Sequence, residues 1–79
     1  MIALIGIMVQ DETAVEKVNT LLHEYRDCVV GRMGLPLRDD NLSVISLVLK
    51  TDTGRINGLC GKLGSISGVK SKAVYNVVG

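Results

Sequence analysis

The chain has 79 residues, of which 47% are hydrophobic and 22% charged, and its formal net charge is +1. A chain of this length forms one domain, and so small a domain buries only about 60% of the surface that its unfolded chain exposes. We therefore expect a single domain over residues 1–79 whose surplus of apolar side chains promotes self-association. The nearly neutral charge excludes the strongly basic surface that nucleic acids and anionic membranes require.

The first segment, residues 2–10, is an apolar run rich in β-branched side chains such as Ile2, Ile5 and Val9. It is too short for a membrane-spanning helix, and it lacks the basic leader and small-residue cleavage site of a signal peptide. We interpret it as a strand that is buried on both faces. The expected location of the protein is cytoplasmic, without membrane contact.

Residues 11–13 mark the start of a helix, because Thr13 and Glu16 have the spacing of a capping box. Apolar residues then recur at steps of three and four, which predicts that one face of this helix packs on the core. The expected core positions are Ala14, Val15, Val18, Leu21, Leu22 and Tyr25. The opposite side, which includes His23, is expected to face solvent.

Two strand candidates follow the helix. Residues 28–36 contain Gly31, Gly34 and Pro36, which place this strand at a sheet edge because proline cannot donate a ladder hydrogen bond. A polar turn at residues 38–41 leads into a third strand, from Leu42 to about Lys50. Both faces of the third strand are largely apolar: Ser43, Ile45, Leu47 and Leu49 on one, Leu42, Val44, Ser46 and Val48 on the other.

The last third of the chain predicts a second helix and a fourth strand. Residues 51–53 offer an N-cap, and the helix is expected to end at Gly64 or Gly68. Its core stripe comprises Ile56, Leu59, Cys60, Leu63 and Ile66, and its other side bears Gly54, Gly58, Gly61 and Ser65. These small residues either leave room for a partner helix or ligand, or lie on a solvent-exposed surface where their small size has no function. Residues 69–78, with Val69, Val74, Val77 and Val78, form the final strand.

This order of elements predicts an α+β fold, the ferredoxin-like βαββαβ sandwich, with a four-stranded antiparallel sheet and both helices on one face. The spatial strand order is then 4-1-3-2, which puts the two doubly apolar strands in the centre. The face without helices would expose an apolar patch, so we expect a second copy to cover it, in a homodimer or tetramer. The expected interface residues are Leu42, Val44, Ser46 and Val48, with one set from the first strand.

The sequence shows neither a catalytic constellation nor a P-loop, and its acidic residues stand in caps and turns. We therefore expect no enzyme, no catalytic residue and no cofactor. The candidate ligand-binding residues are Gly31, Arg32, Met33, Gly34 and Arg38. The glycine-flanked Arg32 can present its planar fork to a carboxylate or phosphate. Alternatively, the same glycines and proline prevent this edge strand from pairing with strands of other molecules and so protect against aggregation.

Cys28, Cys60 and His23 are the residues on which a metal-handling or redox function would depend. The cysteines are too far apart for a CxxC motif, and a single histidine makes a poor metal centre. We interpret the cysteines as structural thiols and His23 as a surface residue, and we expect no metal site. A small metal-handling or redox protein stays open as an alternative.

Three segments, residues 30–36, 41–49 and 61–64, carry a resemblance to the family of iron-only hydrogenase system regulators. The likeness extends over nearly the whole chain. It implies an ACT-like fold, similar to the C-terminal domain of the nickel-responsive repressor. Such domains pair through their sheets and bind small effectors at subunit interfaces.

The resemblance to the repressor has limits that narrow the expected function. Ile2 follows no ribbon-helix-helix, the repressor's multi-histidine site has no counterpart, and Asp11 lacks the Pro-Gly that follows the acidic residue of an ACT effector loop. We expect a small oligomeric regulatory or effector-binding module that has no DNA-binding domain and does not contact nucleic acid directly. The alternatives are the metal-handling or redox protein and a purely structural assembly domain.

Overall fold

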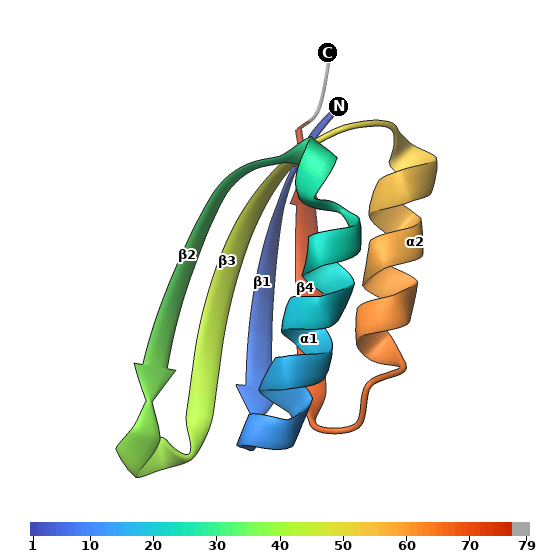
Figure 1. Ribbon diagram of the computed structural model, residues 1–79. Helices are drawn as coiled ribbons and strands as arrows, with labels where there is room; N and C mark the ends of the chain where they lie inside the picture. Colours follow the sequence, from blue (N-terminus) through green and yellow to red (C-terminus); the bar gives the residue numbers. More distant parts are fainter. Residues whose placement is uncertain (77–79) are drawn as a thin grey trace.

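The computed structural model describes residues 1–76 and shows one four-stranded antiparallel sheet with two helices on the same face (Figure 1). The elements are β1 (Ile2–Gln10), α1 (Glu12–Glu24), β2 (Val29–Leu37), β3 (Leu42–Lys50), α2 (Thr53–Gly64) and β4 (Val69–Tyr75), with short 3-10 turns η1 (Arg26–Cys28) and η2 (Arg38–Asp40). The strand order is β2-β3-β1-β4. This arrangement confirms the predicted ferredoxin-like fold.

The two central strands, β1 and β3, alternate between a buried and an open face. Their register pairs Ile5 with Leu47 on the helix side and Leu4 with Val48 on the other side. The apolar side chains of β1 and β3 on the helix side are buried, whereas Leu4 on the other side is 48% exposed. The prediction that β1 is buried on both faces is therefore not met within the single chain, because both helices cover the same side.

The core lies between the sheet and the helices. Most of the predicted core positions are buried, whereas Val15, Leu21, Cys60 and Ile66 are only partly buried at its margin. β1 contributes four residues, β3 three, and α1 and α2 three each. They are Ala3, Ile5, Ile7, Val9, Ile45, Leu47, Leu49, Ala14, Val18, Leu22, Ile56, Leu59 and Leu63. Each of these side chains exchanges water for apolar neighbours, which is the main force that holds so small a fold together.

The start of α1 differs from the predicted capping box. Asp11 is the N-cap, with φ of 63°, and its carboxylate accepts a hydrogen bond from the backbone N–H of Ala14 at 2.9 Å. Thr13 therefore lies inside the first turn, because the cap residue directly follows the last residue of β1. At α2 the cap is Asp52, which accepts from the N–H of Arg55 at 2.8 Å, as the sequence predicted for residues 51–53.

The edge strands also differ in detail from their predicted bounds. β2 begins at Val29, because Cys28 belongs to η1, and its pairing with β3 is shifted between Val29 and Gly31. β4 ends at Tyr75, and the predicted strand positions Val77 and Val78 lie outside the described residues. Over residues 1–76, neither helix has the length and apolar character needed to cross a bilayer.

Candidate functional site

The five predicted ligand residues lie along β2 and η2, but they do not converge on one place. Arg32 pairs with Leu47 and stands on the helix side of the sheet, whereas Met33 pairs with Ser46 and stands on the open side. Arg38 lies beyond the end of β2, in η2. The strand alternation separates neighbours that the sequence had grouped as one segment.

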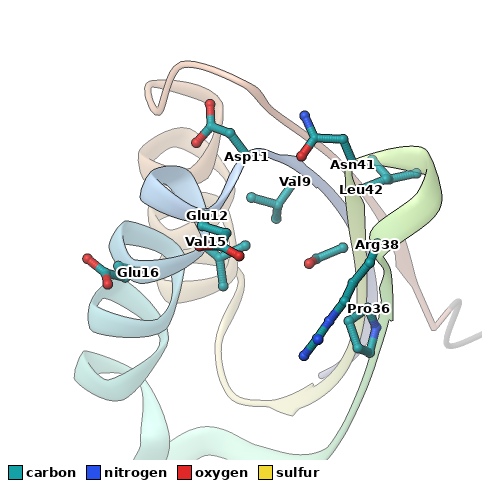
Figure 2. A pocket seen from close by; sticks show the side chains of 10 residues that line it. Val9, Asp11, Glu12, Val15, Glu16, Pro36, Arg38, Asn41 and Leu42 are labelled. Atoms are coloured by element: carbon teal, nitrogen blue, oxygen red, sulfur yellow. The ribbon is translucent and has the colours of Figure 1, made fainter.

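A hollow of about 450 Å³ lies between the start of α1 and the turn that joins β2 to β3 (Figure 2). We call it the hairpin groove. Val9, Val15 and Leu42 give it an apolar lining, and Arg38 extends from the turn past Pro36. The groove exists because the β2–β3 hairpin projects beside the first turn of α1, where no helix covers it (Figure 1).

The two walls of the hairpin groove carry opposite charges. Glu12 and Glu16 belong to the α1 wall, although Glu16 points away from the hollow in Figure 2, and Arg38 stands on the hairpin wall. Asp11 also borders the groove, but its carboxylate is engaged in capping α1. Over residues 1–76 Arg38 forms no ion pair. The groove can therefore receive a small ligand that carries charge of either sign.

A second hollow, of about 290 Å³, lies between the C-terminal half of α1 and β2. We call it the arginine hollow. Its polar lining consists of Asn19, His23, Arg26 and Arg32, and its apolar lining of Leu22, Val29 and Leu47. Arg32 donates from Nη2 to Oδ1 of Asn19, and Arg26 donates from Nη1 to the carbonyl of His23 at 2.9 Å. The sequence singled out Arg32, but its companions, Asn19 and His23 on α1 and Arg26 in η1, were not among the predicted effector-binding residues.

The sheet face without helices, which we call the open face, is a continuous apolar surface. The predicted interface residues Leu42, Val44, Ser46 and Val48 all stand there and are partly buried by their neighbours. The strand register adds residues whose place the sequence had not settled: Leu4, Met8, Met33, Leu35 and Val74. Met8 is 53% exposed and Met33 67% exposed.

Gly6 lies in the middle of the open face and forms a shallow depression there. A Cβ atom added at Gly6 would have no heavy atom within 4 Å, and the adjoining hollow of about 340 Å³ is bordered by Met8, Val44 and Lys72. Lys70 pairs with Met8, so it stands on the same face. The four strands contain no acidic residue. The open face is therefore apolar with a basic margin along β4.

A charged cluster around Tyr25 joins α1 to α2. The Arg55 guanidinium and the Lys62 ammonium each lie 5.3 Å from the centre of the Tyr25 ring. Arg55 also donates to both carboxylate oxygens of Asp27, at 2.6 and 3.0 Å, and these bonds hold the pKa of Asp27 below its usual value. A Cβ at Gly58 would lie 3.5 Å from the Tyr25 hydroxyl. The space beside Gly58 on the glycine-bearing side of α2 is therefore next to Tyr25 of the same chain.

The cysteines and the histidine are dispersed in the fold. Cys28 is buried, and its thiol lies 3.1 Å from the carbonyl of Tyr25, to which it donates. Cys60 is half-buried, and desolvation raises the pKa of its thiol. His23 is exposed. In the part of the chain that the structure describes, no three His, Cys, Asp or Glu side chains are grouped so that they could hold a metal ion.

Two of the solved structures that match show what this chain is similar to. The structure of uncharacterized protein TM1266 from Thermotoga maritima matches with a TM-score of 0.90 and 46% identity, over 92% of each chain. A formyltetrahydrofolate deformylase from Pseudomonas putida KT2440 matches with a TM-score of 0.68 and 16% identity, over 96% of this chain and 29% of that one, which shows a shared fold only. A comparison with curated proteins gives no significant match.

The family comparison agrees with the first of these structures. The model of the TM1266-like family, described as "Iron-only hydrogenase system regulator, putative", matches residues 1–73. The match therefore covers almost all of the described fold, including both hollows and the open face apart from Val74. The chain belongs to the TM1266-like family of iron-only hydrogenase system regulators, as its resemblance in residues 30–36, 41–49 and 61–64 had predicted.

Proposed function

We propose that the protein is a non-catalytic regulatory module of an iron-only hydrogenase system, which assembles as a homo-oligomer through its open face and responds to a small effector. The family description supports the regulatory role. The observation that carries the proposal is the open face itself, where apolar side chains of β1, β2 and β4 are exposed and those of β3 are half-buried in the single chain.

The size of the open face suits a second copy of the chain. Three strands of nine residues and one of seven, spaced about 4.8 Å apart and rising about 3.3 Å per residue, give a flat footprint of roughly 500 Å². Side-chain relief makes the accessible area larger, so it reaches the lower end of the roughly 600 to 1,000 Å² that each partner of a specific complex buries. At about 25 cal/mol per Å², burial of a few hundred Å² contributes several kcal/mol.

Three of the eight acidic side chains, which an enzyme could use as acid or base, have structural roles here. Asp11 and Asp52 cap the two helices, and Asp27 is bound by Arg55. The metal-handling alternative depends on Cys28, Cys60 and His23, which are not grouped together within residues 1–76. These roles support a module that binds rather than one that catalyses.

The effector is proposed to bind beside β2. The hairpin groove and the arginine hollow lie on the helix side of this strand, and each contains one of the predicted arginines, Arg38 or Arg32. The same strand carries Met33 and Leu35 on the open face, so ligand binding on its helix side can alter how a second copy packs against it. That coupling would make the assembly a regulatory element.

Three measurements test the proposal. Sedimentation velocity of the wild-type chain should give a dimer or tetramer at micromolar concentration, and a stable monomer contradicts the assembly. Deletion of the gene in its host should change the transcript level of the iron-only hydrogenase, and the wild-type gene should restore it. A thermal-shift screen in which no metabolite stabilises the protein would favour the purely structural alternative, because any ligand of the native state raises the melting temperature.

A further inference from the structure

We infer that the arginine hollow is the effector site, and that it binds a small molecule with a carboxylate or phosphate group on an apolar body. This inference deepens the effector part of the proposed function and rests on it. It assigns a binding role to Asn19 and His23 on α1 and to Arg26 in η1, in addition to Arg32 on β2.

The two guanidinium groups of the hollow are positioned by neutral acceptors. Arg32 is held by the side-chain oxygen of Asn19, and Arg26 by the backbone carbonyl of His23. Each guanidinium has five N–H donors, so most of them are free for a ligand. Over residues 1–76 neither arginine forms an ion pair, in contrast to Arg55, which is bound to Asp27.

The charge balance of the hollow favours an anion. Asp27 follows Arg26 in the chain, but both of its oxygens are engaged by Arg55. The C-terminal end of α1 also lies at this hollow and carries a partial negative charge of about one half. The two full positive charges of Arg26 and Arg32 are larger than this partial negative charge. Planar guanidinium forks bind carboxylate and phosphate oxygens in pairs, which gives the site its chemical preference.

The apolar lining defines the rest of the ligand. Leu22 and Leu47 are buried and Val29 is half-buried, so the hollow offers an apolar wall beside its two charges. A hollow of about 290 Å³ is at the small end of ligand pockets, which are typically about 300 to 1,000 Å³. The site therefore suits a compact ligand, such as a short branched or aromatic acid or its phosphate counterpart, rather than a nucleotide.

The experiment uses the full chain, labelled with ¹⁵N, and titrates it with acetate, 3-methylbutanoate and inorganic phosphate. The Arg26 and Arg32 side-chain signals and the Asn19 and His23 amides should shift with one dissociation constant. 3-Methylbutanoate should bind at least about fourfold more tightly than acetate, the factor that one buried methylene supplies. The relative affinity for phosphate distinguishes a phosphorylated effector from a carboxylate.

Substitutions distinguish specific binding in the arginine hollow from unspecific attraction of the anion to positive charge. Arg26→Gln and Arg32→Gln should each weaken 3-methylbutanoate binding at least tenfold, and Arg32→Lys should weaken it although the charge is kept. Lys17→Gln removes one charge from an exposed position of α1 outside the hollow, and should change the affinity less than twofold. Unchanged melting temperatures show that the variants stay folded.

Three results would overturn the inference. Equal weakening by Lys17→Gln would indicate unspecific attraction, and weakening only by Arg38→Gln would place the ligand in the hairpin groove. Absence of binding by all three probes at millimolar concentration would refute the site. If the wild-type chain still forms oligomers and another metabolite still stabilises it, the proposed function stands without this inference. A monomeric wild-type chain would instead contradict the proposed assembly, whatever the anion titration shows.

Discussion

Met8→Lys is the substitution that tests the open face most directly. Met8 lies in a central strand, and its paired neighbours are Val44 and Lys70. Because its side chain is already 53% exposed, the substitution should leave the stability of the single chain within about 0.5 kcal/mol. In an oligomer formed through this face, however, the same position is buried under the second copy.

The expected loss follows from the exposed part of the methionine. Full burial of a methionine side chain contributes about 1.5 to 3 kcal/mol, so its exposed half contributes roughly 0.8 to 1.5 kcal/mol. A two-fold dimer contains the position twice, which gives roughly 1.6 to 3 kcal/mol and a dissociation constant raised about 15- to 150-fold. The lysine ammonium can reach solvent along the rim, so its desolvation adds to this figure only partly.

The measurement is sedimentation velocity over a concentration series, with Thr20→Lys as the matched control. Thr20 is exposed on α1, away from the sheet, so this control adds the same charge without touching the open face. Met8→Lys should shift the oligomer toward monomer, whereas Thr20→Lys should sediment like the wild type. Equal dissociation constants for the Met8 variant and the wild type would refute the assembly through this face.

Three further predictions concern other parts of the fold. Gly68→Ala should destabilise the chain by about 1 to 3 kcal/mol in urea unfolding, because Gly68 has φ of 82° and a Cβ there would lie 3.2 Å from the Gln10 carbonyl oxygen; an unchanged midpoint would contradict the strain. Asp27 has a pKa below its ordinary value of 3.8, so its pairing with Arg55 stabilises the fold above that pH and is lost as the pH falls through the lowered value. The melting-temperature gap between the wild type and Asp27→Asn should therefore be present at pH 7 and shrink at pH 2, and a gap that persists at pH 2 would exclude this linkage. The Cys60 thiol, whose pKa is raised above 9.0 by burial, should react slowly with iodoacetamide at pH 7.5, as followed by mass spectrometry, and rapid labelling would show that it is not shielded.

The elements and the topology were predictable because they depend on local periodicity. The alternation in residues 42–50 places Val44 and Val48 on one face without any knowledge of their partners, and the structure confirms this division. The steps of three and four from Ala14 to Leu22 likewise predict the buried side of α1. Such patterns are reliable because turning the wrong face inward would expose every apolar side chain of the element to water and bury its polar ones.

The parts that were not predictable depend on register and on contacts between distant residues. Arg32 lies beside Asn19 because a shift between Val29 and Gly31 changes the pairing of β2, and no local pattern reveals that shift. The proximity of Gly58 to Tyr25 is equally a property of the packed helices. At the start of α1, Asp11 and Thr13 are both possible cap residues, and the place where β1 ends makes Asp11 the cap.

The placement of the two tyrosines gives the protein a built-in optical probe. The chain has no tryptophan, so Tyr25 and Tyr75 dominate its near-ultraviolet signal. Tyr25 is enclosed by two cations, and the hydroxyl of Tyr75 donates to Oδ1 of Asn57 at 2.7 Å, so both rings report on the docking of helices against the sheet. Neither ring stands on the open face. Melting of the helical layer should therefore change tyrosine emission strongly, while association through the uncovered strands should leave it almost unaltered, so the two processes can be followed separately without a label.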